Sequence, residues 1–221
     1  MASVVDICNL ALAHLGDSAT VSSIDPPEGS AQADHCARFY PIARDTLLES
    51  HQWGFTVRRA ALARLADVAG PEWDYAYAVP TGMLNVISVL PADATDDYVE
   101  APLVFWSQAP VMSGARYNTQ PFTIETMADG SQAILTDQVD AWARYTVSIT
   151  DSSKFSPLFV GCLSWLLARY LAGPVLKGDA GVAAGRTCFN TYLQRVRDAT
   201  ESDSNQRQTK PAHVVSWMAA R

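Results

Sequence analysis

Basic residues are scarce in this chain of 221 residues, which carries 16 Lys and Arg against 23 Asp and Glu and a formal net charge of −7. A surface that neutralises nucleic-acid phosphates needs an excess of Lys and Arg, so a basic nucleic-acid grip would require strong local clustering of these residues. Charged residues make up only 18% of the chain and hydrophobic residues 48%. This balance excludes a disordered chain and predicts one large globular domain or two small ones.

Long hydrophobic runs are also missing. The longest apolar run extends from Leu158 to Ala168, is interrupted by Ser164, and is far shorter than the ~20 residues that a membrane-spanning helix needs. We therefore expect no membrane span. The opening segment MASVVDICNLALAHLG carries an acid and no basic residue ahead of its apolar stretch, which argues against an export signal and predicts synthesis in a cytoplasm.

Cysteines are few and form no Cys-x-x-Cys pair. All four lie in segments with helical spacing, which predicts buried free thiols: Cys8, Cys36, Cys162 and Cys188. The adjacent His35 and Cys36 would point about 100° apart on a helix, so they do not form a nucleophilic dyad. The remaining histidines, His14, His51 and His213, show no zinc-binding spacing.

Motifs for catalysis or cofactor binding are absent as well. The sequence contains no GxSxG, GxxxxGK[ST] or GxGxxG pattern, and nothing in it selects a pair of carboxylates. An acidic cluster lacks the alternating ligands and central glycine of a calcium loop, so we interpret it as a solvated turn: Asp93, Asp96, Asp97 and Glu100. We therefore assign no catalytic residue, no metal ligand and no cofactor.

Helical spacing dominates the first part of the chain. Ser3 with Asp6 resembles a capping box and begins a short helix that Gly16 can end in a left-handed conformation. A second helix is predicted from about residue 30 to 51, and Pro41 should kink it without ending it.

Helical spacing returns in the last third of the chain. The Ser156-Pro157 pair predicts the start of a helix that is apolar nearly all round, and therefore central, and that ends at Gly173-Pro174. A further helix is predicted from about residue 179 to 200. Its apolar stripe consists of Val182, Phe189, Leu193 and Val196.

Between these helical parts, from Trp53 onward, the apolar residues recur with a period of two, which is typical of strands with one buried face. Strands are predicted at residues 75–79, 84–89, 99–107, 122–127, 132–136 and 142–149. The Asp129-Gly130 pair predicts a hairpin between two of them. Short strands separated by Pro, Gly and Asp turns favour a small antiparallel sandwich or barrel.

Each amphipathic helix needs a partner face, and packing all four helices together is the simplest solution. We therefore predict an α+β fold with a discontinuous four-helix bundle, formed by residues 1–52 and 151–201. An antiparallel β sandwich or barrel-like domain, residues 53–150, is inserted into it. Residues 202–221 would form an extended C-terminal arm.

The C-terminal arm combines a polar, aperiodic segment with large apolar residues near its end: Val214, Val215, Trp217 and Met218. Aromatic residues that fill pockets dominate interface energies, so Trp217 is a candidate anchor on another protein. The alternative is that the arm folds back onto its own domain. Residues 186–221 hold six basic and three acidic residues, a local charge of +3 against −10 for the first 185 residues. This opposite sign favours an acidic partner surface.

Several stretches, spread in order over residues 5 to 200, resemble the tail tubular protein A, or head-to-tail adaptor, family of short-tailed bacteriophages. They are ICNLALAHLGD, CARFYPIARDTLLESHQWGFTVRRAALA, WDYAYAVPTGMLNVISV, the hairpin ending AILTD, and YTVSITDSSKFSPLFVGCLSWLLARYLA. The chain departs from the family pattern at about residues 91–120 and after Ser202, so partner contacts there are the least transferable.

The resemblance implies a structural protein of the virion rather than an enzyme, located in the tail at the head-tail junction and made in the host cytoplasm. Family members assemble as a dodecameric ring beneath the portal and connect it to the tail nozzle. Genomic DNA passes through the channel without specific binding, which an acidic wall would favour. Trp73, Trp106 and Trp142 fit ring interfaces as well as a core.

The resemblance further implies that the C-terminal arm is a strap laid onto the portal. The docking residues would be Pro211, Val214, Val215, Trp217, Met218 and Arg221. Two alternatives from other classes remain open. A tail-associated hydrolase acting on bacterial cell-wall or surface glycans would need two carboxylates about 5 to 10 Å apart. A monomeric cytoplasmic binding module would keep its arm folded.

Overall fold

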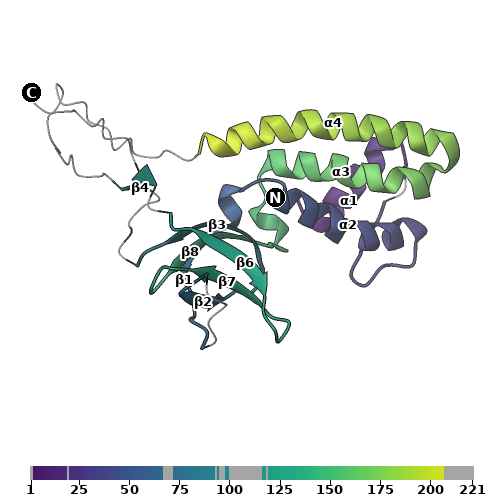
Figure 1. Ribbon diagram of the computed structural model, residues 1–221. Coiled ribbons are helices and arrows are strands. Elements are labelled where there is room, and N and C mark those ends of the chain that lie inside the picture. Colours follow the sequence, from purple (N-terminus) through teal and green to yellow (C-terminus); the bar gives the residue numbers. More distant parts are fainter. Residues whose placement is uncertain are drawn as a thin grey trace, which may run out of the picture. The chain divides into compact units, whose positions relative to one another are not determined.

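The computed structural model describes residues 2–18, 20–66, 72–92, 94, 98–99, 116–117 and 119–206. It shows an α+β fold, with helices at both ends of the chain and antiparallel sheets between them (Figure 1). The chain divides into two compact units. The helical unit comprises residues 2–56 and 148–206, and the β unit comprises the described residues of 57–147.

The helical unit contains α1 (Val4–His14), α2 (Ala31–Glu49), α3 (Pro157–Leu176) and α4 (Gly178–Ser204), with short 3₁₀ turns at Gly54–Thr56 and Ser152–Lys154. The capping box at the start of α1 is confirmed: the Asp6 backbone N–H donates to Ser3 Oγ at 3.1 Å, and the Ser3 N–H donates to Asp6 Oδ2 at 2.8 Å. Gly16 adopts a φ of +76°, as the predicted left-handed stop requires.

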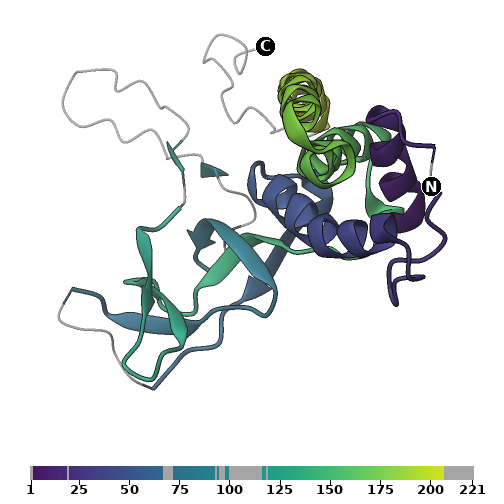
Figure 2. The same cartoon turned by 90° about the vertical axis from the view of Figure 1, so that its right-hand side faces the viewer.

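Helix α3 contacts all three other helices, in agreement with its apolar sequence, and lies beside α4 in both views of the chain (Figures 1 and 2). The prediction that it ends at Gly173-Pro174 is wrong, because α3 continues to Leu176. Leu171 and Ala172 are buried, and this packing holds the turn that contains Pro174 in place. The chain then turns at Lys177, whose φ is +55°.

By length and composition alone, α3 is long and apolar enough to cross a membrane. The sequence analysis considered only the shorter apolar run from Leu158 to Ala168 and therefore did not indicate this. Half of its most apolar 18-residue window is buried within the unit. Contacts with α1, α2 and α4 supply the apolar neighbours that lipid would otherwise provide. We therefore interpret α3 as the core helix of the helical unit.

Helix α4 buries a different face from the predicted one. Its buried residues are Gly181, Cys188, Tyr192 and Ala199. The residues of the predicted stripe follow these buried residues by about one position, so the stripe faces a different direction. Within it, Val182 is 56% exposed and Leu193 is 40% exposed. Small residues at Gly181 and Gly185 let α4 approach α3 closely, and this close contact decides which face turns inward.

The β unit contains two three-stranded antiparallel sheets. One has the order β1 (Val57–Ala61), β8 (Trp142–Val147) and β3 (Met83–Leu90), and the other β2 (Tyr75–Ala78), β7 (Gln132–Thr136) and β6 (Phe122–Thr126). A two-stranded pair consists of β4 (Tyr98–Val99) and β5 (Arg116–Tyr117). The hairpin predicted at Asp129-Gly130 joins β6 to β7, with Gly130 at a φ of +83°.

Strand β1 was not predicted from the sequence, and most of the strand predicted at residues 99–107 lies outside the described residues. Buried and exposed residues do not alternate near the end of β3, because Ser88, Val89 and Leu90 are all buried. Its pairing with β8 shifts register twice, which breaks the period of two.

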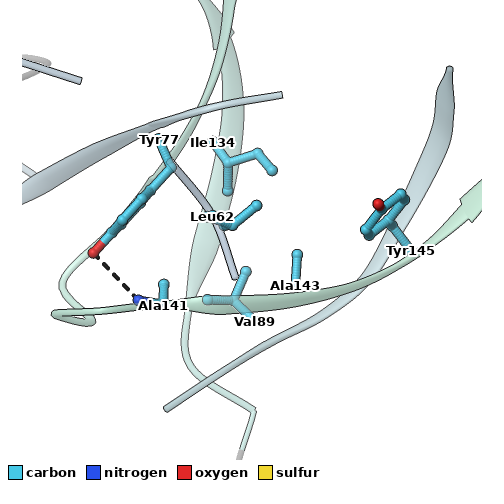
Figure 3. Packing of buried hydrophobic residues seen from close by; sticks show 7 residues of the cluster. All are labelled: Leu62, Tyr77, Val89, Ile134, Ala141, Ala143 and Tyr145. Carbon is cyan, nitrogen blue, oxygen red and sulfur yellow. Dashed lines mark hydrogen bonds between the residues drawn. The ribbon is translucent and has the colours of Figure 1, made fainter. Parts of the chain in front are cut away.

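Residues of both three-stranded sheets meet in one buried cluster (Figure 3). Its members are Leu62, Tyr77, Val89, Ile134, Ala141, Ala143 and Tyr145. The hydroxyl of Tyr77 reaches the edge of this cluster and accepts a hydrogen bond from the Ala141 backbone N–H at 3.4 Å. The cluster thereby fixes the turn between β7 and β8.

Candidate interaction surface

The docking residues predicted in the C-terminal arm all lie outside the described residues: Pro211, Val214, Val215, Trp217, Met218 and Arg221. The same holds for Trp106, His213 and the acidic residues Asp93, Asp96, Asp97 and Glu100. Trp73 and Trp142, predicted as core or interface residues, are each half-buried in the β unit.

The last turn of α4, which precedes the arm, is bound to the segment after α2. Asp203 accepts the backbone N–H of Gly54 through both carboxylate oxygens, and His51 Nε2 lies 3.4 Å from Asp203 Oδ2. The neighbouring Trp53 is fully buried, and its indole N–H donates to the carbonyl of Leu47 at 2.8 Å. The point at which the chain leaves the helical unit is therefore fixed by polar and apolar contacts.

An open groove of about 420 Å³ lies between α3 and α4 near the start of α4. It is lined by Arg169, Tyr170, Gly173, Gly181, Val182, Gly185, Arg186 and Phe189. A Cβ at Gly181 would lie 2.8 Å from the carbonyl oxygen of Ala172, so only glycine permits this approach of the two helices. Aromatic and aliphatic side chains provide the apolar part of the lining.

Two arginines supply the charge of the groove. The Arg169 guanidinium lies 3.9 Å from the centroid of the Phe189 ring and 5.9 Å from that of Tyr170, which are cation–π contacts. Arg169 and Arg186 are both exposed. Within the described part of the chain, no ion pair engages either of them. The groove therefore offers apolar contact together with unneutralised positive charge.

The groove adjoins the exposed stripe of α4. Val182 belongs to both, and Leu193 continues the stripe toward the C-terminal end of the helix. The sequence pattern identified these apolar residues but indicated a buried face. The error came from treating the apolar stripe as the core face, when the glycines and small residues next to it form the contact with α3.

His14 and Ser164 form a partly buried pair that resembles a catalytic dyad. His14 Nε2 lies 3.1 Å from Ser164 Oγ, and the His14 ring stacks on Trp165 with centroids 3.7 Å apart. The Ser164 hydroxyl donates to the carbonyl of Gly161 at 2.9 Å, so it accepts from the imidazole rather than giving it a proton. Because Ser164 is also fully buried, we assign the pair a structural role.

The predicted state of the cysteines is confirmed: all four are free and buried. Cys8 of α1 shares a hydrogen bond with Cys36 of α2, and this bond together with burial raises the pKa of Cys8. Burial raises the pKa of Cys162 to about 11 and also raises the pKa of Cys188. Cys8, Cys162 and Cys188 therefore lack the properties of an activated nucleophile, whereas the hydrogen bond with Cys8 lowers the pKa of the buried Cys36. The Cys8–Cys36 contact has no signal in a single sequence, because the two residues are 28 positions apart.

Four carboxyl groups at exposed turns and helix ends have a pKa below the ordinary value, caused first by hydrogen bonds from nearby serines: Asp6, Glu28, Asp129 and Asp151. Such groups stabilise local turns and do not supply a proton near neutral pH. Among the described residues, no three His, Cys, Asp or Glu side chains gather as metal ligands.

No protein-family model matches the chain, and a comparison with curated proteins finds no match. The groove and the stripe provide apolar area and two arginines, which are the chemical features of a protein-binding surface.

Proposed function

We propose that this chain is a head-to-tail adaptor of a short-tailed bacteriophage, a structural component of the virion rather than an enzyme. Its copies form a ring between the portal and the tail nozzle, a dodecamer by the resemblance to the adaptor family, and genomic DNA passes through the ring without specific binding. The ordered sequence stretches that resemble the adaptor family support this function. The observation that carries it is the exposed apolar stripe of α4, because a ring subunit must bury such faces against neighbours.

The finer architecture belongs to the same proposal. The four helices, which pack around α3, would act as a discontinuous bundle that forms the body of the ring. The β unit, whose two sheets share one buried cluster, would act as a sandwich-like insertion that faces the tail side or neighbouring subunits. Its half-buried Trp73 and Trp142 provide aromatic area for such contacts.

The C-terminal arm would bind the portal, with Trp217 and Met218 as apolar anchors and Arg221 as a charged contact. The bond between Asp203 and Gly54 supports this assignment, because it fixes the helix from which the arm leaves. An arm that starts from a fixed point loses less freedom on binding than one attached to a fraying helix.

Truncation after Asn205 tests the docking role. The shortened chain and the full chain are each mixed with the purified portal protein from the same phage, and attachment is measured by co-sedimentation and by electron microscopy. We expect the full chain to form rings on the portal and the truncated chain to lose attachment. A double variant, Trp217→Ala with Met218→Ala, should show the same loss, whereas Ser216→Ala should attach normally.

Undiminished attachment of the truncated chain would overturn the docking role of the arm. Light scattering, with and without portal, tests the ring itself. A mass equal to one chain without portal, together with a portal mass that does not change when the chain is added, would overturn the adaptor function and favour a monomeric binding module.

A further inference from the structure

The turn between β7 and β8 presents an apolar residue between two carboxylates. Val139 is 49% exposed, and Asp137 and Asp140 on either side of it are exposed as well. The other three residues of this turn, Asp137, Gln138 and Asp140, are polar. We call residues 137–140 the Val139 loop.

Several hydrogen bonds hold the Val139 loop and the residue that follows it. The Tyr77 hydroxyl donates to the carbonyl of Gln138 at 2.7 Å. It also accepts the Ala141 N–H at 3.4 Å (Figure 3). Asp137 Oδ1 accepts the backbone N–H of Asp74 at 3.1 Å, and the Gln138 side chain donates to the carbonyl of Val139 at 2.7 Å. A loop ordered before binding loses little conformational entropy when it docks.

Asp140 in this loop adopts a φ of +51°, a left-handed conformation that is uncommon for residues other than glycine. Sequence position 140 carries a carboxylate rather than the glycine that would relieve this strain. The conformation places Asp140 directly before the buried Ala141 while its own side chain stays exposed. Binding to a partner would explain why a strained carboxylate and a valine are both exposed at neighbouring positions.

We propose that the Val139 loop of one copy of this chain docks in the α3–α4 groove of a second copy. Val139 contacts the apolar lining formed by Val182 and Phe189. Asp137 and Asp140 face the two arginines of the groove, Arg169 and Arg186, which have no ion pair within the described residues. The partner of the α3–α4 groove is then a second copy of the chain, so this inference rests on the self-assembly in the proposed function.

The positive charge of the groove favours the Val139 loop over the C-terminal arm as its occupant. Residues 207–221 contain Arg207, Lys210 and Arg221 and no Asp or Glu, so the arm has the same sign as the groove. The Val139 loop carries two carboxylates and no basic residue. Like charges brought together at an interface weaken binding, whereas the loop supplies the opposite sign at both arginines.

The geometry of this contact is heterologous, because the groove and the loop are different surfaces and each copy offers both. Heterologous contacts generate a ring when the rotation between neighbours closes, and a filament when it does not. The contact therefore provides the kind of repeating interface that an assembly of many copies requires.

Cross-linking between copies tests the proposal. Full-length Val139→Cys protein, labelled with ¹⁵N, is mixed at high concentration with unlabelled Val182→Cys protein and treated with a short bis-maleimide. The native cysteines are buried and do not compete. We expect a cross-linked peptide pair in which one peptide is labelled and the other is not. In the matched control, Ile42→Cys replaces Val182→Cys, since Ile42 is also exposed on a helix but does not line the groove.

Arg186→Glu added to the Val182→Cys chain should lower the cross-link yield by about tenfold. Asp140→Arg added to the Val139→Cys chain should restore much of the yield with this partner, because the charges are then exchanged. Rescue shows that the charge pair, rather than a folding defect, caused the loss. Equal yields with the Val182→Cys and Ile42→Cys partners, or an unchanged yield with Arg186→Glu, would overturn the contact.

The portal assay separates this proposal from the proposed function. Rings that form on the portal without the Val139–Val182 cross-link would refute the contact and leave the adaptor function standing. The specific cross-link together with absent portal attachment would support the contact and refute the adaptor function.

Discussion

Asp203, near the C-terminal end of α4, accepts the backbone N–H of Gly54 through both carboxylate oxygens, at 3.1 Å and 3.0 Å. The two residues are 149 positions apart, so this contact joins the last helix of the chain to the segment that follows α2. A hydrogen bond to a charged acceptor is stronger than a neutral one. The contact therefore fixes the last turn of the longest helix, from which residues 207–221 continue.

Asp203→Ala should loosen this last turn and destabilise the protein by about 1.5–3 kcal/mol, the value typical of a hydrogen bond to a charged group. The Gly54 N–H would lose its acceptor and the end of α4 would fray. Urea denaturation measures the loss, and hydrogen exchange of residues 199–206 locates it. Glu201→Ala is the matched control, because Glu201 is exposed in the same turn. Equal stability of the two variants would contradict the anchoring role.

Gly181→Ala and Gly185→Ala should change stability in opposite directions. A Cβ at Gly181 would lie 2.8 Å from the Ala172 carbonyl oxygen and would force α3 and α4 apart, at a cost of about 1–3 kcal/mol. A Cβ at Gly185 would lie 3.6 Å from the Ala172 Cβ, an ordinary contact, and alanine stabilises a helix interior by about 0.5–1 kcal/mol relative to glycine.

Urea midpoints of these two glycine variants provide the measurement. Both substitutions add the same methyl group to the same helix, so the difference between them isolates the close approach to Ala172. A stabilising effect of Gly181→Ala would mean that the helices separate at little cost.

Tyr77→Phe should destabilise the turn between β7 and β8. The hydroxyl donates to the Gln138 carbonyl and accepts the N–H of the buried Ala141, so its removal leaves two backbone groups without this partner. We expect a loss of about 1–2 kcal/mol and faster hydrogen exchange at residues 138–141. Tyr75→Phe serves as the control, since Tyr75 lies in the same strand and is half-buried. Unchanged exchange in Tyr77→Phe would contradict the role of this hydroxyl.

Stability should fall as the pH decreases below about 6.5, the ordinary pKa of histidine, in part because of His14. Burial, and then the positive charge of Arg195, lower the pKa of His14 in the folded protein. Below the unfolded pKa the unfolded chain binds a proton that the folded protein resists, so stability is lost as the pH falls toward the folded value. His14→Gln should therefore flatten the pH dependence of the urea midpoint between pH 7.5 and 5.5. Identical slopes for the two proteins would argue against this contribution.

The sequence determined those parts of the protein that depend on neighbouring residues. Ser3 and Asp6 form the predicted capping box, Ser156 and Pro157 begin α3, and Gly130 makes the predicted hairpin turn. Each feature needs only a few adjacent side chains and their own backbone, so the local pattern carries the whole signal.

The tertiary structure decided which faces are buried and which distant residues meet. The apolar stripe of α4 predicted an inward face at Val182, yet contact of Gly181 with Ala172 turns Val182 outward. Likewise, Cys8 meets Cys36 only because α1 and α2 lie together in the fold, and Asp203 meets Gly54 only because the last helix packs against the segment that follows α2. Periodicity shows that a helix has an apolar side, but close packing selects the side that fits, because the absence of one Cβ lets two backbones approach where a larger residue could not.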